Sequence, residues 1–368
     1  MKKNFKIEHL DSLAQGVSKI NAEIVFIPRT LPNEEGICEI TGSKGRVSFA
    51  KLTHLEKHSD LRTKPECRHY EKCGGCDYLH TNYQTEIEFK KSALKEIFIR
   101  SHRFESLPPI TCLSASSRYQ YRNRVQLHYD KKAKKLGFKS TDNKITEIQD
   151  CLLPIDKISQ EIKSLYTDNS WLKNVKSQRN KGHIELYLKD EKVQTTVNAH
   201  YSSGGFTQVN KEMNEKLQEI LSDYFQKTDS ESIIDLFGGA GNITKHSKAD
   251  KVFVIDSTDS KYIKLQNPSQ KYFQINLYDK DVINKLQELG IQKNQSLVLD
   301  PPRSGLKDID AFTQELEPKS ILYVSCNPQT LARDIKKVDD SYKLEKLYLI
   351  DFFPGTKHFE TVAIMNRR

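Results

Sequence analysis

Short apolar runs that end at polar residues recur through the second half of the chain. The clearest are Ile233–Leu236, Val252–Asp256, Ile321–Val324 and Thr361–Met365, and a further strand is expected to end at Asp300. Uninterrupted apolar runs of this length are typical of strands buried in a sheet. The pattern therefore predicts an α/β sheet, whose chemistry is expected at the strand ends.

Helical spacing occurs between and before these runs. Asn327 is a good N-cap and Pro328 suits the first helical position, so a helix is expected to begin there. Apolar residues three and four positions apart predict a helix within Asn82–Arg103, and another that opens at Phe206–Asn210.

The first 60 residues instead alternate short strand-like segments with turns. The turns Leu31–Gly36 and Gly42–Gly45 have the composition of tight connections. This spacing predicts a small β-barrel of the OB type, a frequent nucleic-acid scaffold, and an unspecialised β-barrel is the alternative. The predicted strands are Phe5–Leu10, Ala22–Ile27, Gly36–Ile40 and Gly45–Phe49.

Composition narrows the class of protein. A chain of 368 residues is long for one domain and suggests two or three. The 58 basic and 49 acidic residues give a net charge of +9, which favours a polyanionic partner such as nucleic acid. The sequence contains neither an N-terminal apolar h-region nor an apolar run of about 18 residues, so neither a signal peptide nor a membrane span is expected. Seven cysteines, without a secretion signal, favour a metal site or catalysis in a reducing cytoplasm.

Three of these cysteines are clustered as Cys67-x5-Cys73-Gly-Gly-Cys76. The glycines let the backbone fold tightly around a bound ion or cluster. A fourth ligand is needed, and Cys151, 75 positions after Cys76, is the candidate. Spacing alone leaves open a four-cysteine zinc site and a 4Fe–4S cluster.

Another cysteine, Cys326, lies between an apolar run and a predicted helix. The partial positive charge at the helix N-terminus favours thiolate over thiol, which makes Cys326 a candidate nucleophile. A buried structural cysteine is the alternative.

A glycine-rich turn follows the run at Ile233–Leu236. Gly238, Gly239 and Gly241 would let the backbone approach a ligand before a helix begins. Asp256, 21 residues after Asp235, is placed to bind ribose hydroxyls. The pattern by itself fits NAD as well as S-adenosylmethionine.

Basic and aromatic residues interleave between Arg118 and Lys139. Basic groups can neutralise phosphates and tyrosines can stack on unpaired bases, which is compatible with RNA contact. A charge run alone is more typical of a solvated β-hairpin, so both interpretations stay open at this point. The residues are Arg118, Tyr119, Tyr121, Arg122, Arg124, Tyr129, Lys131, Lys132, Lys134, Lys135 and Lys139.

Three segments together carry a family resemblance. Asp300-Pro-Pro-Arg303 forms a DPPR segment, Ser325–Asp334 an SCNP-x-T-x-ARD segment, and Phe353–Glu360 an FP-x-T-x-H-x-E segment. In this order they resemble the RNA uracil-C5 methyltransferases that use S-adenosylmethionine.

The resemblance implies roles for individual residues. Cys326 would be the nucleophile that adds to carbon 6 of uracil, and Glu360 the base that removes the proton from carbon 5. Gly238 stands where the family commonly has Cys, and Asp256 where it commonly has Glu. The implied contacts to S-adenosylmethionine are Gln208, Phe237, Asn242, Asp256, Asn276 and Asp300.

The resemblance also implies an architecture and a substrate. It divides the chain into a TRAM-like β-barrel (1–60), an iron–sulfur and β-rich RNA-binding domain (61–205) and a Rossmann-like methyltransferase domain (206–368). The C-x5-C-G-G-C pattern is similar to the 4Fe–4S site of the ribosomal members, which implies 23S rRNA as the substrate and a monomer as the default.

Three alternatives stay open. Methylation of the T-loop of tRNA is the runner-up within the class. An amino-methyltransferase also has an acidic-Pro-Pro segment but needs no cysteine nucleophile. A catalytically inactive RNA-binding module is the alternative outside enzymes.

Overall fold

The computed structural model describes residues 1–199, 208–227 and 231–368, which form two compact units. The first unit contains Met1–Lys90, Ala115–Glu212 and Phe352–Lys357. The second contains Lys91–Ser114, Met213–Asp351 and His358–Arg368. The chain thus passes between the units five times.

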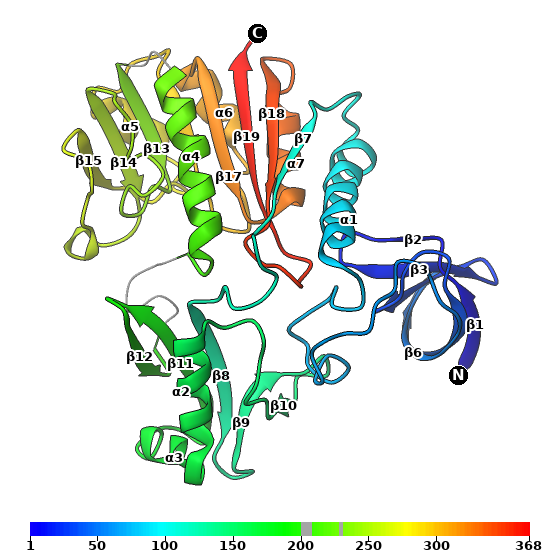
Figure 1. Ribbon diagram of the computed structural model, residues 1–368. Helices are drawn as coiled ribbons and strands as arrows, with labels where there is room; N and C mark the ends of the chain where they lie inside the picture. The colour runs from blue at the N-terminus through cyan, green and yellow to red at the C-terminus, as the bar shows by residue number, and fades with distance from the viewer. Residues whose placement is uncertain (200–207, 228–230) are drawn as a thin grey trace. The chain divides into compact units, whose positions relative to one another are not determined.

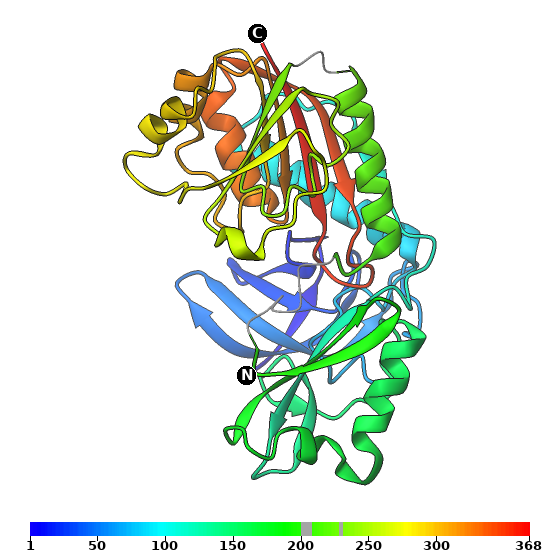
Figure 2. The same ribbon diagram turned by 90° about the vertical axis from the view of Figure 1, so that its left-hand side faces the viewer.

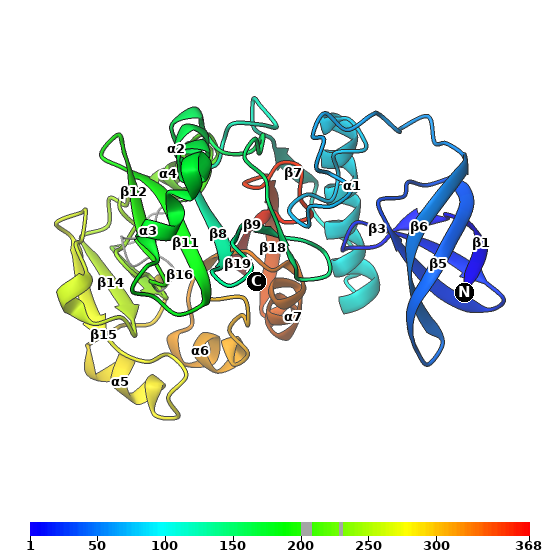
Figure 3. The ribbon, with the colours of Figure 1, turned by 90° about the horizontal axis from the view of Figure 1, so that it is seen from below.

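The N-terminal part of the first unit is a six-stranded sheet in the order β1-β5-β6-β4-β3-β2, drawn in blue in Figure 3. The Lys6 N–H donates to the Ser18 hydroxyl over 3.2 Å and so connects the first strand to the third, as in a barrel. Cys38 is fully buried in its core. The strands are β1 (Lys2–Lys6), β2 (His9–Leu10), β3 (Gln15–Ile20), β4 (Glu23–Pro28), β5 (Glu35–Lys44) and β6 (Val47–Lys57).

A second sheet in this unit has the order β10-β9-β8-β11-β12, with all neighbours antiparallel. One face packs against the amphipathic helix α2 (Asp156–Tyr166), through a core that includes Leu127, Leu136 and Ile184. A 3-10 turn, η2 (Thr167–Asn169), and α3 (Trp171–Asn174) follow that helix. The strands are β8 (Arg124–Asp130), β9 (Lys135–Lys139), β10 (Ile145–Thr146), β11 (Lys181–Lys189) and β12 (Lys192–Val197).

The second unit is built on an eight-stranded sheet in the order β15-β14-β13-β16-β17-β19-β18-β7. The five strands from β15 to β17 are parallel, while β19 is antiparallel to both of its neighbours. The strands are β7 (Ile110–Leu113), β13 (Ser232–Leu236), β14 (Lys251–Asp256), β15 (Gln270–Gln274), β16 (Ser296–Leu299), β17 (Ser320–Ser325), β18 (Tyr342–Ile350) and β19 (Glu360–Arg367).

Helices cover both faces of this sheet. Figures 1 and 2 show α4 on one face and α5, α6 and α7 on the other. The predicted Rossmann-like α/β architecture is confirmed for this unit. The helices and turns are α1 (Tyr83–Glu96), the π-helical η1 (Ile97–Ser101), α4 (Lys211–Lys227), η3 (Ser260–Tyr262), α5 (Val282–Glu288), α6 (Ile309–Leu316) and α7 (Pro328–Val338).

Several predicted elements are present and some details differ. The helix expected at Pro328 is α7, and the Asn327 side chain caps it by accepting from the Gln329 N–H over 3.2 Å. The helix expected to open at Phe206 begins at Lys211, while Phe206 itself lies outside the described residues. Strand β3 and helix α2 were not predicted. In the described ranges, no helix is long and apolar enough to cross a membrane.

Candidate functional site

Three carboxylates lie at or near the carboxyl ends of adjacent parallel strands in the second unit. Asp235 is the fourth residue of β13, Asp256 ends β14, and Asp300 directly follows β16. Parallel strands bring their carboxyl ends to one edge of the sheet, which is where open α/β sheets bind ligands.

Burial and neighbouring negative charge raise the pKa values of Asp235 and Asp300. Burial raises the pKa of Asp235 to about 7, and the charges of Asp300 and Asp256 add to the increase, although a 2.6 Å hydrogen bond from the Thr244 hydroxyl opposes it. Burial also raises the pKa of Asp300 to about 7, with Asp256 adding to the effect. Within the described chain, Asp235 Oδ1 is buried without a hydrogen-bond partner. A ligand could therefore supply the cationic or hydrogen-bonding group that would pair with Asp235 at this edge.

This charge distribution separates the two cofactors that the glycine pattern left open. S-adenosylmethionine carries a cationic sulfonium and an ammonium group, which acidic side chains attract. NAD carries an anionic pyrophosphate, which negative charge at Asp235 and Asp300 would repel. The acidic edge therefore fits the methyl donor.

The glycine-rich turn approaches this edge without forming the expected helix. Gly239 and Gly241 have φ values of +51° and +71°, in the left-handed region that interrupts a right-handed helix. A Cβ on Gly241 would come within 2.3 Å of the Gln270 side chain, which donates to the Gly241 carbonyl over 2.7 Å. Side-chain bonds thus hold this turn. The expectation of a helix directly after Gly241 was wrong.

The other predicted cofactor residues of the second unit follow the carboxyl ends of these strands, at the same edge of the sheet. Phe237 follows β13 with φ +61°, and its ring centroid is 5.6 Å from that of Tyr278. Asn276 comes two residues after β15 and is exposed, with its Nδ2 donating to Asp279 over 2.7 Å. Asn242 is half-buried in the glycine turn.

Tyr278 was not among the predicted site residues. It is 54% exposed, and its hydroxyl lies 3.2 Å from the Ser304 hydroxyl and 3.3 Å from the Gly305 carbonyl. Tyr278 thus connects the β15 end of the edge to the Asp300–Gly305 segment. Its place after β15, close to the expected Asn276, was the available sequence signal.

Cys326 and Glu360 are brought together by strand register. Ser325 pairs with Thr361 across antiparallel strands β17 and β19, and the Thr361 hydroxyl donates to the Ser325 carbonyl over 2.9 Å. The next residues along each strand, Cys326 and Glu360, are therefore neighbours. The charge of Glu360 raises the pKa of Cys326, which agrees with this placement.

The Cys326 thiol is protonated at neutral pH in the ligand-free protein. Burial raises its pKa to about 11, the charges of Glu360 and Asp300 add to the increase, and Arg303 opposes it by charge and by a side-chain hydrogen bond. The expectation that the helix N-terminus would favour the thiolate was therefore wrong for this state, because desolvation and negative charge outweigh the helix dipole.

Glu360 is also mostly protonated at neutral pH. Burial raises its pKa to about 8, Asp300 adds to the increase, and Arg303 opposes it. Arg303 is therefore the cation shared by the thiol and the carboxyl group. The DPPR segment contains this residue but does not specify its partners in the fold.

Asp334 has other partners. Its Oδ2 accepts from the Tyr323 hydroxyl and from the Leu306 N–H, each over 2.7 Å, and Arg333 pairs with its Oδ1 over 2.7 Å. These bonds join the Asp300–Leu306 segment to α7. Asp334 therefore has a structural role in positioning the segment that contains Arg303.

The segment Phe352–Lys357, just before Glu360, belongs to the first unit. The Gly355 N–H donates to Glu86 Oε1 over 2.7 Å, and the Gly355 carbonyl accepts from the Asp77 N–H over 2.8 Å. A Cβ on Gly355, whose φ is +82°, would meet a leucine side chain at 3.1 Å. Glu360 thus follows a tightly held loop.

Glu86 is itself part of a buried ionic network. Its carboxylate lies 2.7 Å from Lys90 Nζ and 2.6 Å from Arg118 Nη2, and both Glu86 and Lys90 are fully buried. Arg118 also donates to the Thr81 carbonyl over 2.6 Å. The network fixes the backbone that surrounds Gly355.

Gln208, expected at the cofactor, belongs to the first unit. Its carbonyl accepts from Asn123 Nδ2 over 2.8 Å, and the Asn123 N–H donates to the Val209 carbonyl over 3.0 Å. The Tyr121–Arg124 segment therefore holds the segment that contains Gln208. The contact of Gln208 with a cofactor stays a prediction.

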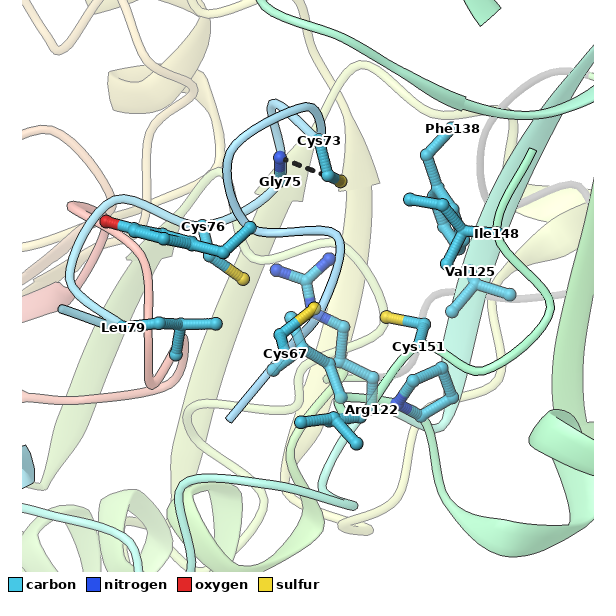
Figure 4. Close-up of a pocket in the computed structure, with 14 residues that line it drawn as sticks. Cys67, Cys73, Gly75, Cys76, Leu79, Arg122, Val125, Phe138, Ile148 and Cys151 are labelled. Carbon is cyan, nitrogen blue, oxygen red and sulfur yellow. Dashed lines mark hydrogen bonds between the residues drawn. The ribbon is translucent and has the colours of Figure 1, made fainter. Parts of the chain in front are cut away.

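The four cysteines expected as ligands line one cavity of about 50 Å³ in the first unit (Figure 4). Cys67, Cys73, Cys76 and Cys151 point into it, and the Arg122 guanidinium lies among them. The volume is several times the roughly 10–15 Å³ that one water molecule needs. Most of the remaining wall is apolar, with Leu79, Val125, Phe138 and Ile148 among its residues.

Comparisons with known proteins give a family model and several relatives that match this chain. The family model of the tRNA (uracil-5-)-methyltransferases matches residues 176–368. The 23S rRNA (uracil(1939)-C(5))-methyltransferase RlmD of Shewanella woodyi is 28% identical over 99% of this chain and 95% of its own length. RlmD of Vibrio vulnificus is 27% identical over 98% and 95%.

A solved structure resembles the whole chain. The Pyrococcus abyssi tRNA (uracil-54, C5)-methyltransferase, in complex with S-adenosyl-L-homocysteine, superposes with a TM-score of 0.67. It covers 99% of this chain and 100% of its own, at 19% identity. This likeness supports the fold.

Proposed function

Because this chain belongs to the tRNA (uracil-5-)-methyltransferase family, we propose that it methylates carbon 5 of a uridine in 23S rRNA, with S-adenosylmethionine as the methyl donor. The observation that carries the proposal is the adjacency of Cys326 and Glu360 across β17 and β19. Arg303 acts on both groups, and the acidic edge at Asp300 adjoins them.

Cys326 and Glu360 suit the two halves of a substitution at uracil. Attack of the Cys326 sulfur on carbon 6 forms an S–C6 bond and moves the C5–C6 π electrons towards carbon 5 and the carbonyl at carbon 4. Carbon 5 then takes the methyl group that S-adenosylmethionine supplies. Glu360 accepts the carbon 5 proton, the C5–C6 double bond re-forms, and the S–C6 bond breaks to release the cysteine sulfur.

The ligand-free pKa values define what must change before this reaction. The Cys326 thiol has to lose its proton, and Glu360 has to be ionised when it acts as a base. Arg303 favours both anions. A cationic ligand at the Asp300 edge would lower these pKa values further, because opposite charge favours the ionised acid.

The choice of 23S rRNA rests on the RlmD relatives, which match over nearly the full length of this chain. The tRNA T-loop is the second candidate, favoured by the fold of the Pyrococcus enzyme. Attack at carbon 6 needs access to the face of the base, so the target uridine has to be unpaired or extruded from its stack.

We also propose that the cysteine-lined cavity holds a 4Fe–4S cluster. In the described residues, no three His, Cys, Asp or Glu side chains are placed to hold a single metal ion. A tetrahedral zinc site would need all sulfurs at about 2.3 Å from one point. Thiols arranged around a cavity suit a larger tetrathiolate-bound group, and Cys67, Cys73, Cys76 and Cys151 would be its ligands. Such a group would have a structural role and would stabilise the Cys67–Cys76 loop, because methyl transfer has no redox step.

Metal analysis tests the cluster. Anaerobically purified protein should contain about four irons and four sulfides per chain. Cys151→Ala should lower the iron content and the associated visible absorption, whereas Cys112→Ala, a partly buried cysteine in β7, should leave both unchanged. One zinc per chain without iron would contradict the cluster.

The methyl transfer is tested with labelled S-adenosylmethionine and, separately, unmodified 23S rRNA, 16S rRNA and bulk tRNA. Label in 5-methyluridine from 23S rRNA is expected. Cys326→Ala should abolish both methylation and covalent adducts, while Glu360→Gln should accumulate the adduct because the proton at carbon 5 stays in place. Label from tRNA alone would overturn the substrate, and full activity of Cys326→Ala would overturn the mechanism.

A further inference from the structure

The basic run between Arg118 and Lys139 does not form one RNA-binding strip. Arg118 is bonded to Glu86 and to backbone carbonyls, and Arg122 lies in the cysteine-lined cavity. Arg124 is buried 3.7 Å from Glu185. Lys131 donates to the Gln178 carbonyl over 2.5 Å. Much of this charge is therefore used inside the first unit.

Two lysines of this run, Lys135 and Lys139, lie instead on one face of the β9-β8-β11 sheet, which they share with basic residues from outside the run. The register pairs Lys135 with Asp130, Asp130 with Lys181, and His128 with His183. Side chains alternate along a strand, so Lys139 lies on the same face as Lys135. The opposite face holds Leu127, Leu136 and Ile184 and packs against α2.

These residues line a groove of about 550 Å³ in the first unit. Its wall contains five basic side chains and one acidic side chain, Asp130, which pairs with Lys181 at 3.2 Å. Lys144 pairs with Asp142 at 2.7 Å, and the other three basic side chains leave the groove positive. Burial lowers the pKa of His128, and the charges of Lys139 and His183 lower it further, which reflects this positive surrounding. The basic residues are Lys135, Lys139, Lys144, Arg179 and Lys181.

The end of the groove at β11 is held by close packing. A Cβ on Gly182 would come within 2.0 Å of Asn198 Oδ1 and 2.7 Å of the Tyr129 hydroxyl. Asn198 Nδ2 donates to that hydroxyl over 2.8 Å, and Asn198 Oδ1 accepts from the His183 N–H over 3.0 Å. The His128 and His183 rings meet edge to face, 6.4 Å apart. The groove therefore presents planar rings in a fixed place.

We propose that this groove binds a single-stranded segment of the substrate RNA, with phosphates at its lysines and bases against the two imidazole rings. The lysine side chains match a polyanion, and imidazole rings are among the stacking partners of unpaired bases. The inference rests on the proposed RNA substrate and adds the surface that binds it outside the active site. Of the basic run, it keeps Lys135 and Lys139 as RNA contacts and joins them to residues of β8 and β11.

Binding of full-length unmodified 23S rRNA to the whole protein tests the groove. The double variant Lys135→Glu with Lys139→Glu reverses the charge of two exposed side chains that do not pack in the core, so the fold should be kept. Affinity should fall at least tenfold near physiological salt. The slope of log K against log salt should become shallower by about 1.5, since each phosphate contact contributes roughly 0.7–0.9.

The matched control is Lys163→Glu with Lys173→Glu, two exposed lysines on α2 and α3, the helices that follow one another beside the opposite face. This variant should keep the wild-type slope. A single-stranded oligonucleotide should compete for wild-type protein better than a duplex of equal length.

Two results would overturn the groove. Equal slopes for both double variants would do so, and so would better competition by the duplex. Failure of wild-type protein to bind or methylate any RNA would instead overturn the proposed function. Methyl transfer at saturating RNA should persist in the groove variant, which separates weakened binding from lost chemistry.

Discussion

At the scale of single residues, Arg303 is the side chain whose role is clearest from the structure and least visible in the sequence. The DPPR segment identifies the residue in the sequence. Its proximity to Cys326 and Glu360 depends on how the Asp300–Gly305 segment packs against α7. Asn327 Nδ2 donates to the Arg303 carbonyl over 2.9 Å, which holds the residue beside Cys326.

Replacing Arg303 with Met should make the Cys326 thiol harder to ionise. Arg303 lowers the pKa of Cys326, so its loss should raise that pKa and slow alkylation by iodoacetamide at pH 9, by about tenfold for each pKa unit. Mass spectrometry of the Cys326 peptide measures the rate. Arg100→Met removes an equal charge from an exposed side chain that pairs with Glu96 and should leave the rate unchanged; an unchanged rate in Arg303→Met would contradict the assignment.

Asp235 should make stability depend on pH. Its folded pKa of about 7 lies above its unfolded value, so its contribution is present below about pH 4 and is lost as pH rises through 7. Asp235→Asn should therefore gain in free energy of unfolding relative to wild type between pH 5 and pH 8, at about 1.4 kcal/mol per pKa unit. Urea unfolding at both pH values measures this. The exposed Asp250→Asn is the control, and parallel profiles for Asp235→Asn and wild type would rule out the effect.

At the scale of elements, the sequence predicted those strands and helices whose consecutive or regularly spaced apolar residues are buried. Strands such as β13 and β17 each contain a run of buried apolar residues, and α7 carries both a cap and an N-terminal proline. Strand β3 was missed because two of its buried residues are Gly16 and Ser18, which carry no hydrophobic signal.

The candidate site was predictable as a set of residues but not as an arrangement. The adjacency of Cys326 and Glu360 depends on the antiparallel insertion of β19 between β17 and β18. The raised pKa values depend on burial, which no motif specifies. Four cysteines separated by up to 84 positions share a cavity only because β8 and the segment before Cys151 fold next to the Cys67–Cys76 loop.

The loop before Glu360 should be sensitive to a single methyl group. Gly355→Ala places a side chain at φ +82° and 3.1 Å from Leu79, so the free energy of unfolding should fall by about 1–2 kcal/mol. Chemical denaturation measures the change. Gly42→Ala, in β5 with no atom within 4 Å of the new Cβ, should change stability by less than about 1 kcal/mol. Equal effects at both positions would show that the loop is not constrained.

At the scale of the whole molecule, the second unit is assembled from three separate stretches of chain. Its core includes Leu94, Phe98 and Phe104, and its edge strand β7 pairs with β18. The family match begins at residue 176 and so omits these residues. The match therefore does not delimit the folding unit.

A fragment of residues 213–368 should not fold to the native state by itself. It lacks β7 and the apolar side chains contributed by Lys91–Ser114, so its sheet and core stay partly uncovered. Thermal unfolding should lose cooperativity, and dye binding to apolar surface should increase. Adding the peptide 91–114 should reverse both changes. Native-like cooperative unfolding of the fragment alone would contradict this account.

The segment Phe352–Lys357 has a consequence for regulation. It is held by the same Asp77–Glu86 region that follows Cys76, and Glu360 comes three residues after its end. If the proposed cluster is lost, the backbone that holds Gly355, five residues before the proposed proton acceptor Glu360, loses its support. With such a cluster, a reaction that transfers no electrons would depend on iron supply and oxygen exposure, and modification of the RNA would report the metal status of the cell.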